Sequence, residues 1–538
     1  MPSPPARTLR GSMIDMRTDH LPVCSASTPP CQGGEKTFPS LRRRGGRGNG
    51  RGGVKTLVLT VALTGTLGAS GCAVGPDYKR PAVEAPANYR FEDAQARDTA
   101  NTAWWTQFGD RELERLIGIA LAENKDVLIA AARVEEYYGR YGAQRGQQFP
   151  QAGLEAQGGS QQVSRLGTPA VPAPGSVRSD FYALDLGVSF ELDLWGRLRR
   201  GTEAARGDLL AIEENRRTVI LTLVASVASS YVNLLDLDRQ LEISRSTLRA
   251  RAESLRIFEL RFKGGTISEL ELQQVRSEYE LALATIPSFE KQIAQQENNL
   301  SVLLGRNPGP LARGGTLENL ALPAVPAGLP SALLERRPDV RRAEQQLVAA
   351  NARIGVAKAA YYPAISLTGL LGVASADLSN LFRSDARTWT FAGTVGQSIF
   401  TGGTLSGQLA ASEAQQKQAL YTYQQTIQTA FGEVENSLVD QAKTRQQVAA
   451  QVRQVDALSR YAYLARLRYE NGYTSYIEVL DSERSLFQAQ IQLVQTQGQL
   501  YVALINLYKA LGGGWVDEAD KLALPPGVDL SRNPPIFP

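Results

Sequence analysis

Residues 181–194, FYALDLGVSFELDL, alternate after Phe181 between apolar side chains and small or acidic ones. The apolar set is Tyr182, Leu184, Leu186, Val188, Phe190, Leu192 and Leu194. Successive residues of a β-strand point to opposite faces, so this stretch predicts one apolar and one polar face. At ~3.3 Å per residue it spans roughly 45 Å, longer than usual strands and enough to cross a bilayer at a tilt. We predict a lipid-facing strand of a membrane barrel, with a soluble sandwich strand as the alternative.

Composition narrows how the chain could meet a bilayer. Of its 538 residues, 43% are hydrophobic, and we expect no apolar run long enough for a mature transmembrane helix. Contact with lipid should then come from strands or from an attached lipid. The net charge of +4 arises in residues 1–71, which hold ten Lys or Arg and three Asp or Glu, so the remainder carries −3. Nothing in this balance indicates nucleic-acid binding.

Residues that commonly carry catalysis are missing after position 71. The single His, His20, all three Met and two of the three Cys precede Cys72. This absence excludes Ser-His-Asp and Cys-His catalysis, His-ligated metals and an internal disulfide from the remainder. The sequence also lacks a phosphate-binding or dinucleotide-binding glycine motif in a strand-to-helix context. We expect no enzyme, no metal site and no bound cofactor.

The N-terminal region divides into three segments. Residues 1–53 are rich in Pro, Ser, Arg and Gly and read as a low-complexity leader, with the true translation start expected at Val54. Residues 54–71 resemble a lipoprotein signal peptide, because a basic residue precedes an apolar region and small residues. Residues 72–110 form a Pro-rich extended segment that should run along another part of the fold.

Cys72 closes the tetrapeptide Ala69-Ser70-Gly71-Cys72, which fits a lipobox. A buried core cysteine behind an apolar helix is the alternative reading. We predict that Cys72 begins the mature protein and carries a diacylglycerol and an acyl chain. Ala73 follows instead of the Asp that usually retains bacterial lipoproteins in the inner membrane, so we expect sorting to the outer membrane.

The rest of the chain repeats one plan of helix, strand hairpin and long helices, and its first helix is expected from Arg111 to Gln148. From Gly201 to about Phe262 apolar residues recur every seven positions, which predicts a supercoiled helix of about 90 Å. The same apolar stripe returns 207 positions later. The expected segments are repeat 1 at 111–312 with the β-hairpin 151–194, a linker at 313–337, repeat 2 at 338–515 with the β-hairpin 364–400, and a tail at 516–538.

Each repeat supplies two strands, with strands expected at 151–163, 181–194, 364–374 and 389–400. Four strands cannot close a membrane barrel, whose smallest members use about eight. Several chains must therefore pool their strands, and the long helices should extend from the shared barrel into the periplasm. The fold class we predict is mainly α with membrane β.

Several motifs in order resemble the TolC-type outer membrane efflux family, and within it the lipoprotein (NodT-like) branch. They are GPDYKRP after the lipobox, DLWGR at 193–197 and RRPDVRRAE at 336–344. The resemblance implies a homotrimer in which duplicated long-helix hairpins form an α-barrel beneath a shared twelve-stranded β-barrel.

The resemblance also implies a function and partners. It implies an outer-membrane, lipid-anchored exit duct of a tripartite efflux system, extending into the periplasm, for drugs, solvents or metals. A periplasmic adaptor protein and an inner-membrane pump, commonly of the RND class, are the implied partners. An exit duct for type I protein secretion is the alternative, and an enzyme or soluble coiled-coil scaffold ranks third. The exported substrate and the cognate pump do not follow from the sequence.

A candidate gate lies at the turn after Gly472. Glu478 and Asp481 stand three residues apart on one helix face, and Glu271 occupies the matching position of repeat 1. A solvated first helical turn is the simpler interpretation. By resemblance, Glu478 and Asp481 align with the acidic ring that constricts the family's periplasmic end.

By the same resemblance, Tyr469 matches the family's gating tyrosine. The family's gating arginine is replaced by Thr474, for which Arg468 or Arg261 could substitute.

Overall fold

The computed structural model describes residues 73–86, 88–90, 103–164, 178–323, 330–512, 515, 516 and 519. All of them belong to one compact unit, Gly68–Pro538. The predicted leader 1–53, the signal peptide 54–71, Cys72 and most of the tail 516–538 lie outside the described residues.

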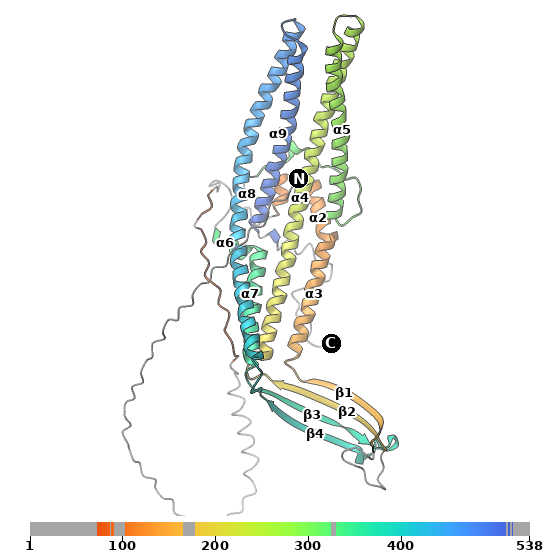
Figure 1. Cartoon of the computed structure of the whole chain (residues 1–538), viewed down its shortest axis with the longest axis vertical. Coiled ribbons are helices and arrows are strands. Elements are labelled where there is room, and N and C mark those ends of the chain that lie inside the picture. The colour runs from red at the N-terminus through yellow and green to blue at the C-terminus, as the bar shows by residue number, and fades with distance from the viewer. Residues whose placement is uncertain are drawn as a thin grey trace, which may run out of the picture. The chain divides into compact units, whose positions relative to one another are not determined.

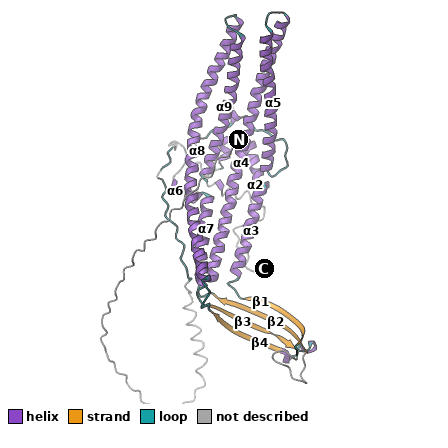
Figure 2. Cartoon of the chain, viewed as in Figure 1, coloured by secondary structure: helices purple, strands orange, loops and turns teal. Residues whose placement is uncertain are grey.

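Long helices dominate the described chain, and four strands form one sheet at one end of them (Figure 2). The elements in chain order are η1 (Trp104–Phe108), α2 (Arg111–Glu123), α3 (Lys125–Gly146), β1 (Gln151–Gln162), β2 (Arg178–Leu192), α4 (Arg197–Lys263), α5 (Glu269–Leu303), η2 (Leu317–Asn319), α6 (Pro330–Arg336), α7 (Pro338–Ala359), β3 (Ala364–Ser375), η3 (Leu378–Asn380), η4 (Ser384–Ala386), β4 (Arg387–Gly396), α8 (Thr404–Glu470) and α9 (Tyr476–Ala510).

The repeat is visible in the lengths of the helices. Helices α4 and α8 each have 67 residues, α5 and α9 each have 35, and equivalent ends lie 207 positions apart. Each long helix reverses into its partner at a glycine with positive φ, Gly265 at +67° or Gly472 at +77°. A side chain with a Cβ is strained in this region, which explains glycine at both turns. The two hairpins, α4–α5 and α8–α9, extend away from the sheet (Figure 1).

The main apolar core gathers halfway along the helices. Trp104 stacks on Tyr508 with ring centroids 4.9 Å apart, and Trp515 and Phe108 complete this aromatic group. Apolar side chains of α2, α4, α8 and α9 continue the core. One stretch of α4 is long and apolar enough to cross a membrane, contrary to our expectation, but 61% of it is buried inside the protein. Burial against neighbouring helices explains its composition.

Three predicted boundaries were wrong. The helical segment expected from Arg111 to Gln148 is broken at Asn124, whose side chain accepts hydrogen bonds from the amides of Asp126 and Val127 and so caps a new helix. Strand β2 ends at Leu192, because the carboxylate of Asp193 instead accepts a hydrogen bond from the Arg199 amide.

The third difference is at β4. This strand ends at Gly396, so Ile399, which belongs to the strand predicted at 389–400, lies beyond it with 97% of its surface exposed. The side chain of nearby Gln397 donates to the carbonyl of Tyr361 at 2.8 Å, which ties this segment to the end of the helix before β3.

The four strands are antiparallel and follow the order β1-β2-β3-β4. Strands β1 and β4 each have one neighbour and a free edge. The two hairpins of the repeats therefore pair through β2 and β3.

Candidate functional site

The register places the predicted lipid-facing side chains of β2 on one face of the sheet. Leu186 lies opposite Leu154 of β1 and Leu371 of β3, and Leu371 lies opposite Trp389 of β4. Leu154, Leu371 and Trp389 are 60% exposed or more. Tyr182, Leu184, Val188, Phe190 and Leu192 follow the same alternation as Leu186. A continuous exposed apolar face of this kind indicates contact with lipid or protein.

The opposite face is mostly polar or small, with Phe181 and Leu370 as apolar exceptions. Asp185 lies opposite Glu155 on one side and Gly372 on the other. An added Cβ at Gly372 would collide with the Asp185 carboxylate, so this position requires glycine. Ser189 and Thr368 form another pair on this face. Such a surface suits water, and the sheet therefore separates an apolar from an aqueous side.

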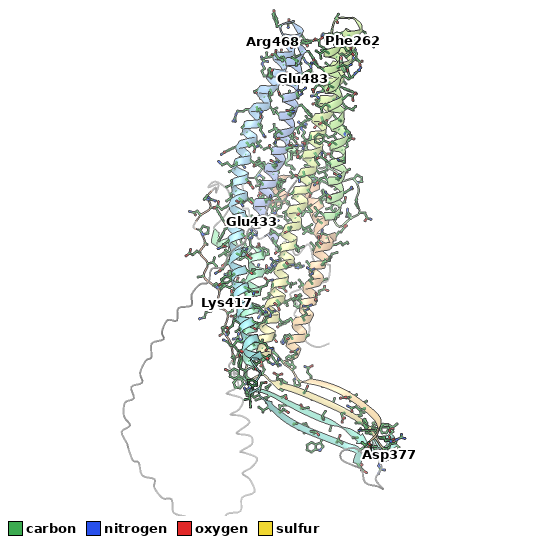
Figure 3. All side chains as sticks on the ribbon, in the orientation of Figure 1. Phe262, Asp377, Lys417, Glu433, Arg468 and Glu483 are labelled. Carbon is green, nitrogen blue, oxygen red and sulfur yellow. The ribbon has the colours of Figure 1, made fainter. Side chains whose placement is uncertain are left out.

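At the far end of the hairpins the structure brings together several predicted gate residues. Arg261 Nη1 of α4 donates to the hydroxyl of Tyr469 in α8 at 3.0 Å. The Arg261 guanidinium also lies 5.9 Å from the centre of the Tyr469 ring. Figure 3 labels Phe262, which follows Arg261, and Arg468, which precedes Tyr469, at the ends of the two hairpins. Arg261 and Tyr469 thus join the two repeats at their turns.

The two predicted gate carboxylates have different surroundings. Glu478 accepts a hydrogen bond from Arg468 Nη1 at 3.0 Å and another from the hydroxyl of Thr474. Thr474, where the resembling family has arginine, therefore binds the same carboxylate as Arg468. Asp481 is exposed and makes no ion pair with any described residue. Asp481 is consequently the more available negative charge.

Glu271 plays a local structural part. Its Oε2 accepts from the backbone amide of Ser268 at 2.9 Å, and its own amide donates to the Ser268 hydroxyl at 3.3 Å. This reciprocal pair is a capping box that starts α5. The carboxylate of Glu271 is thus occupied by its own helix terminus, unlike that of Asp481.

The sequence did not predict a buried ionic cluster between the hairpins. Arg251 of α4 and Glu278 of α5 have side chains only 6% and 8% exposed, with Arg251 Nη1 3.2 Å from Glu278 Oε2. Arg484 of α9 pairs with the other carboxylate oxygen of Glu278. Charged residues in an amphipathic helix ordinarily indicate a solvated face, so no local pattern identifies this contact.

The residues after Cys72 bind along the helices that border the sheet. The Val74 amide donates to the Trp195 carbonyl at 2.9 Å, and Asp77 pairs with the buried guanidinium of Arg200 at 2.6 Å. Gly75 has φ of +111°, and an added Cβ there would lie 2.5 Å from the Gly355 Cα of α7. We call residues 73–80 the N-terminal strap. It brings the chain just after Cys72 to the junction of β2 and α4.

Across the described residues, no group of three or more His, Cys, Asp or Glu could hold a metal ion.

Comparison with known proteins adds independent findings. The family model described as "Outer membrane efflux protein" matches residues 116–306 and 329–513. The solvent efflux pump outer membrane protein SrpC of Pseudomonas putida is 39% identical, over 83% of this chain and 96% of SrpC. The cation efflux system protein CusC of Escherichia coli O6:H1 is 37% identical, over 86% of this chain and 99% of CusC.

A solved structure is similar as well. The open state of the MtrE outer membrane channel of Neisseria gonorrhoeae superposes with a TM-score of 0.75 at 31% identity, covering 82% of this chain and 98% of MtrE.

Proposed function

This chain belongs to the outer membrane efflux protein family and is the outer-membrane channel of a tripartite efflux pump, and we propose that three copies form a passive exit duct for small molecules. It is not an enzyme. It lies in the outer membrane and extends into the periplasm. Relatives of similar length are named for solvent and cation efflux, which supports small-molecule cargo over secreted protein.

The observation that carries the proposal is the open four-stranded sheet. One face is apolar and exposed, the other is mostly polar or small, and the edges of β1 and β4 are unpaired within the described residues. Unpaired edges are not tolerated in the hydrocarbon region of a bilayer. Pairing β4 of one copy with β1 of the next satisfies both edges, and three copies give a closed barrel of twelve strands.

We also propose that a lipid anchors the channel, as in the lipoprotein (NodT-like) branch. The N-terminal strap supports this, because it fixes residue 74 beside Trp195, where the sheet begins. Acyl chains on Cys72 would then enter the leaflet that surrounds the barrel. Two or more lipid signals give stable attachment.

The partners proposed are a periplasmic adaptor protein and an inner-membrane pump of the RND class. They would meet the turns of the hairpins, which point away from the sheet (Figure 1). Pump class is best tested by asking which inner-membrane protein is recovered with the full-length channel after cross-linking in cells.

Purified full-length protein reconstituted into a planar bilayer tests the duct directly. We expect stepwise conductance and a trimer by native mass spectrometry. A folded monomer without conductance would overturn the proposal. A channel that forms normally but restores only protein secretion in a deletion strain would favour the type I secretion alternative.

A further inference from the structure

The two β-hairpins of the sheet share one pairing register. Gln151 of β1 lies opposite Ser189 of β2, and Ala364 of β3 lies opposite Gly396 of β4. Ala364 stands 213 positions after Gln151, and Gly396 stands 207 positions after Ser189. The other pairs of the second hairpin keep both offsets. Each residue of β3 therefore has an equivalent in β1, and each residue of β4 has an equivalent in β2.

Strand β2 continues further toward the helices than β4 does. Residues 190–192 follow the last pair between β2 and β1, and they remain in the strand because they pair with β3, Leu192 lying opposite Ile365. Their equivalents are residues 397–399, which follow the end of β4. Among the described residues no strand lies beside them, because β4 is at an edge of the sheet (Figure 1). Ile399, the equivalent of Leu192, is 97% exposed. A missing neighbour strand thus accounts for the early end of β4.

The proposed ring, on which this inference rests, supplies that neighbour, because β4 of one copy pairs with β1 of the next. If the contact between copies repeats the contact between β2 and β3, the two offsets define the opposite residue at every position. We propose that the copies pair in this register, in which Gly396 lies opposite Glu155 of the next copy and Ile399 lies opposite its Ala152. The pairing extends β4 through Ile399.

The proposed register keeps both faces of the barrel continuous. Odd-numbered residues of β4, such as Trp389, and even-numbered residues of β1, such as Leu154, lie on the apolar face of the sheet. Pairing Ile399 with Ala152 places odd-numbered residues of β4 opposite even-numbered residues of β1 throughout. A shift by one residue would place the apolar face of one copy beside the polar face of the next.

Shifts by two residues keep the faces but disturb the ends of the ladder. In one direction Ile399 would lie opposite Pro150, which has no amide hydrogen to donate to a neighbouring strand. In the other direction Gln151 would lie opposite Gly402, whose φ of +56° does not fit an extended strand. In the proposed register both Pro150 and Gly402 lie outside the paired residues. The ends of the two strands therefore favour the same register as the internal repeat.

Three pairs of cysteines test the register in the full-length trimer. Gln157→Cys is combined in turn with Ala392→Cys, Thr394→Cys or Gly396→Cys, and all four positions lie on the polar face. In the proposed register Gln157 lies opposite Thr394. Directly opposite residues have Cβ atoms about 5 Å apart, whereas diagonal neighbours lie about 7–8 Å apart, too far for an unstrained disulfide. Since β1 and β4 are opposite edges of the sheet, a disulfide must join two copies.

Each protein is oxidised with copper phenanthroline and run on a non-reducing denaturing gel. We expect the Gln157/Thr394 pair to give at least about tenfold more covalent trimer than the other two pairs, because only directly opposite positions satisfy disulfide geometry. Reduction should return this protein to monomers. The Gln157→Cys single variant is the control and should give no covalent trimer. An added Cβ at Gly396 meets no atom within 4 Å, so the Gly396→Cys comparison is sterically fair.

More covalent trimer from the Ala392 or Gly396 pair overturns the register. Absence of a link from all three pairs, while native mass spectrometry still shows a trimer, also overturns it and leaves the proposed duct intact. An unaltered protein that is only monomeric removes the proposed duct and this register with it.

Hydrogen exchange of the unaltered trimer provides a second test that needs no substitution. Amides of residues 397–399 should exchange within about tenfold of the rate for residues 190–192, because both segments pair with a neighbouring strand. Exchange of residues 397–399 at the rate of an unpaired loop would overturn the extension of β4.

Discussion

The carboxylate of Asp236 in α4 packs against the backbone of Gly498 in α9, where an added Cβ would lie 3.2 Å from Asp236 Cγ. Burial raises the pKa of Asp236 to about 6, although a hydrogen bond from Gln240 acts in the opposite direction. Gln240 also accepts from Gln495 of α9 at 3.1 Å. A polar contact thus lies between the two repeats, and its hydrogen bonds do not offset the cost of burying the charged Asp236 carboxylate.

We predict that Asp236→Asn stabilises the trimer at pH 8. The pKa of Asp236 is higher in the folded protein than in the unfolded chain, so the folded protein favours the protonated carboxyl. The folded state therefore loses stability as the pH rises through about 6. The gain at pH 8 should be at most about 3 kcal/mol per chain, since one pKa unit corresponds to about 1.4 kcal/mol. The midpoint of thermal trimer dissociation should rise at pH 8 and match the parent near pH 4. Asp440→Asn, on the exposed surface of α8, is the control, and equal gains at both pH values would refute the argument.

Arg337 links the start of the second repeat to two long helices. Its guanidinium binds Asp339 at 2.6 Å, Glu433 of α8 at 2.7 Å and the Ala510 carbonyl of α9 at 2.9 Å. Arg337→Ala leaves these acceptors without their donor and should cost about 3 kcal/mol of stability. Arg336→Ala, one residue earlier, should be nearly neutral. Comparable losses in thermal unfolding of the two variants would contradict this role.

The N-terminal strap should detach when Gly355 gains a side chain. A Cβ there would lie 2.8 Å from both the Val74 carbonyl oxygen and Arg200 Cγ. We expect trypsin to cleave Gly355→Ala protein after Lys79 about tenfold faster, because cleavage follows the population of the detached strap. Gly142→Ala provides the matched control, since an added Cβ at Gly142 meets no atom within 4 Å. Unchanged cleavage would show that the strap tolerates the methyl group.

Acylation at Cys72 remains a prediction. Cys72→Ala protein should incorporate no labelled palmitate, because Cys72 is the only cysteine from position 72 onward. The measurement compares labelled parent and variant after membrane extraction, with Ser70→Ala as a variant that keeps the cysteine. Palmitate on the Cys72→Ala protein would place the lipid elsewhere.

The sequence predicted those parts of the fold that local periodicity determines. Alternation around Leu186 identified both faces of the sheet, and the 207-residue offset predicted the equal lengths of α4 and α8. The sequence pattern did not predict the helix break at Asn124, because the capping contact forms only once the chain turns there. The ion pairs of Glu278 join residues distant in sequence, and the amphipathic pattern assigns such charges to solvent.

The predicted acidic gate remains to be tested, and the structure leads us to expect different effects from substituting Glu478 and Asp481. Glu478 is bound by Arg468 and Thr474, whereas Asp481 is exposed and has no ion pair among the described residues. In a trimer, three Asp481 carboxylates close to the turns should attract cations and divalent ions. We therefore expect Asp481→Asn channels to lose most of their cation selectivity and divalent block, and Glu478→Gln channels to lose less.

Bilayer recordings under a salt gradient, with and without a divalent salt, measure both properties. Trimers should assemble in the Asp481→Asn variant, since Asp481 makes no ion pair with a described residue. Glu413→Gln, which removes an exposed carboxylate of α8 remote from the turn, should leave the recordings unchanged. A larger effect from Glu478→Gln would mean that Arg468 leaves Glu478 when the ring forms. No effect from either substitution would assign both carboxylates to an ordinary solvated helix face.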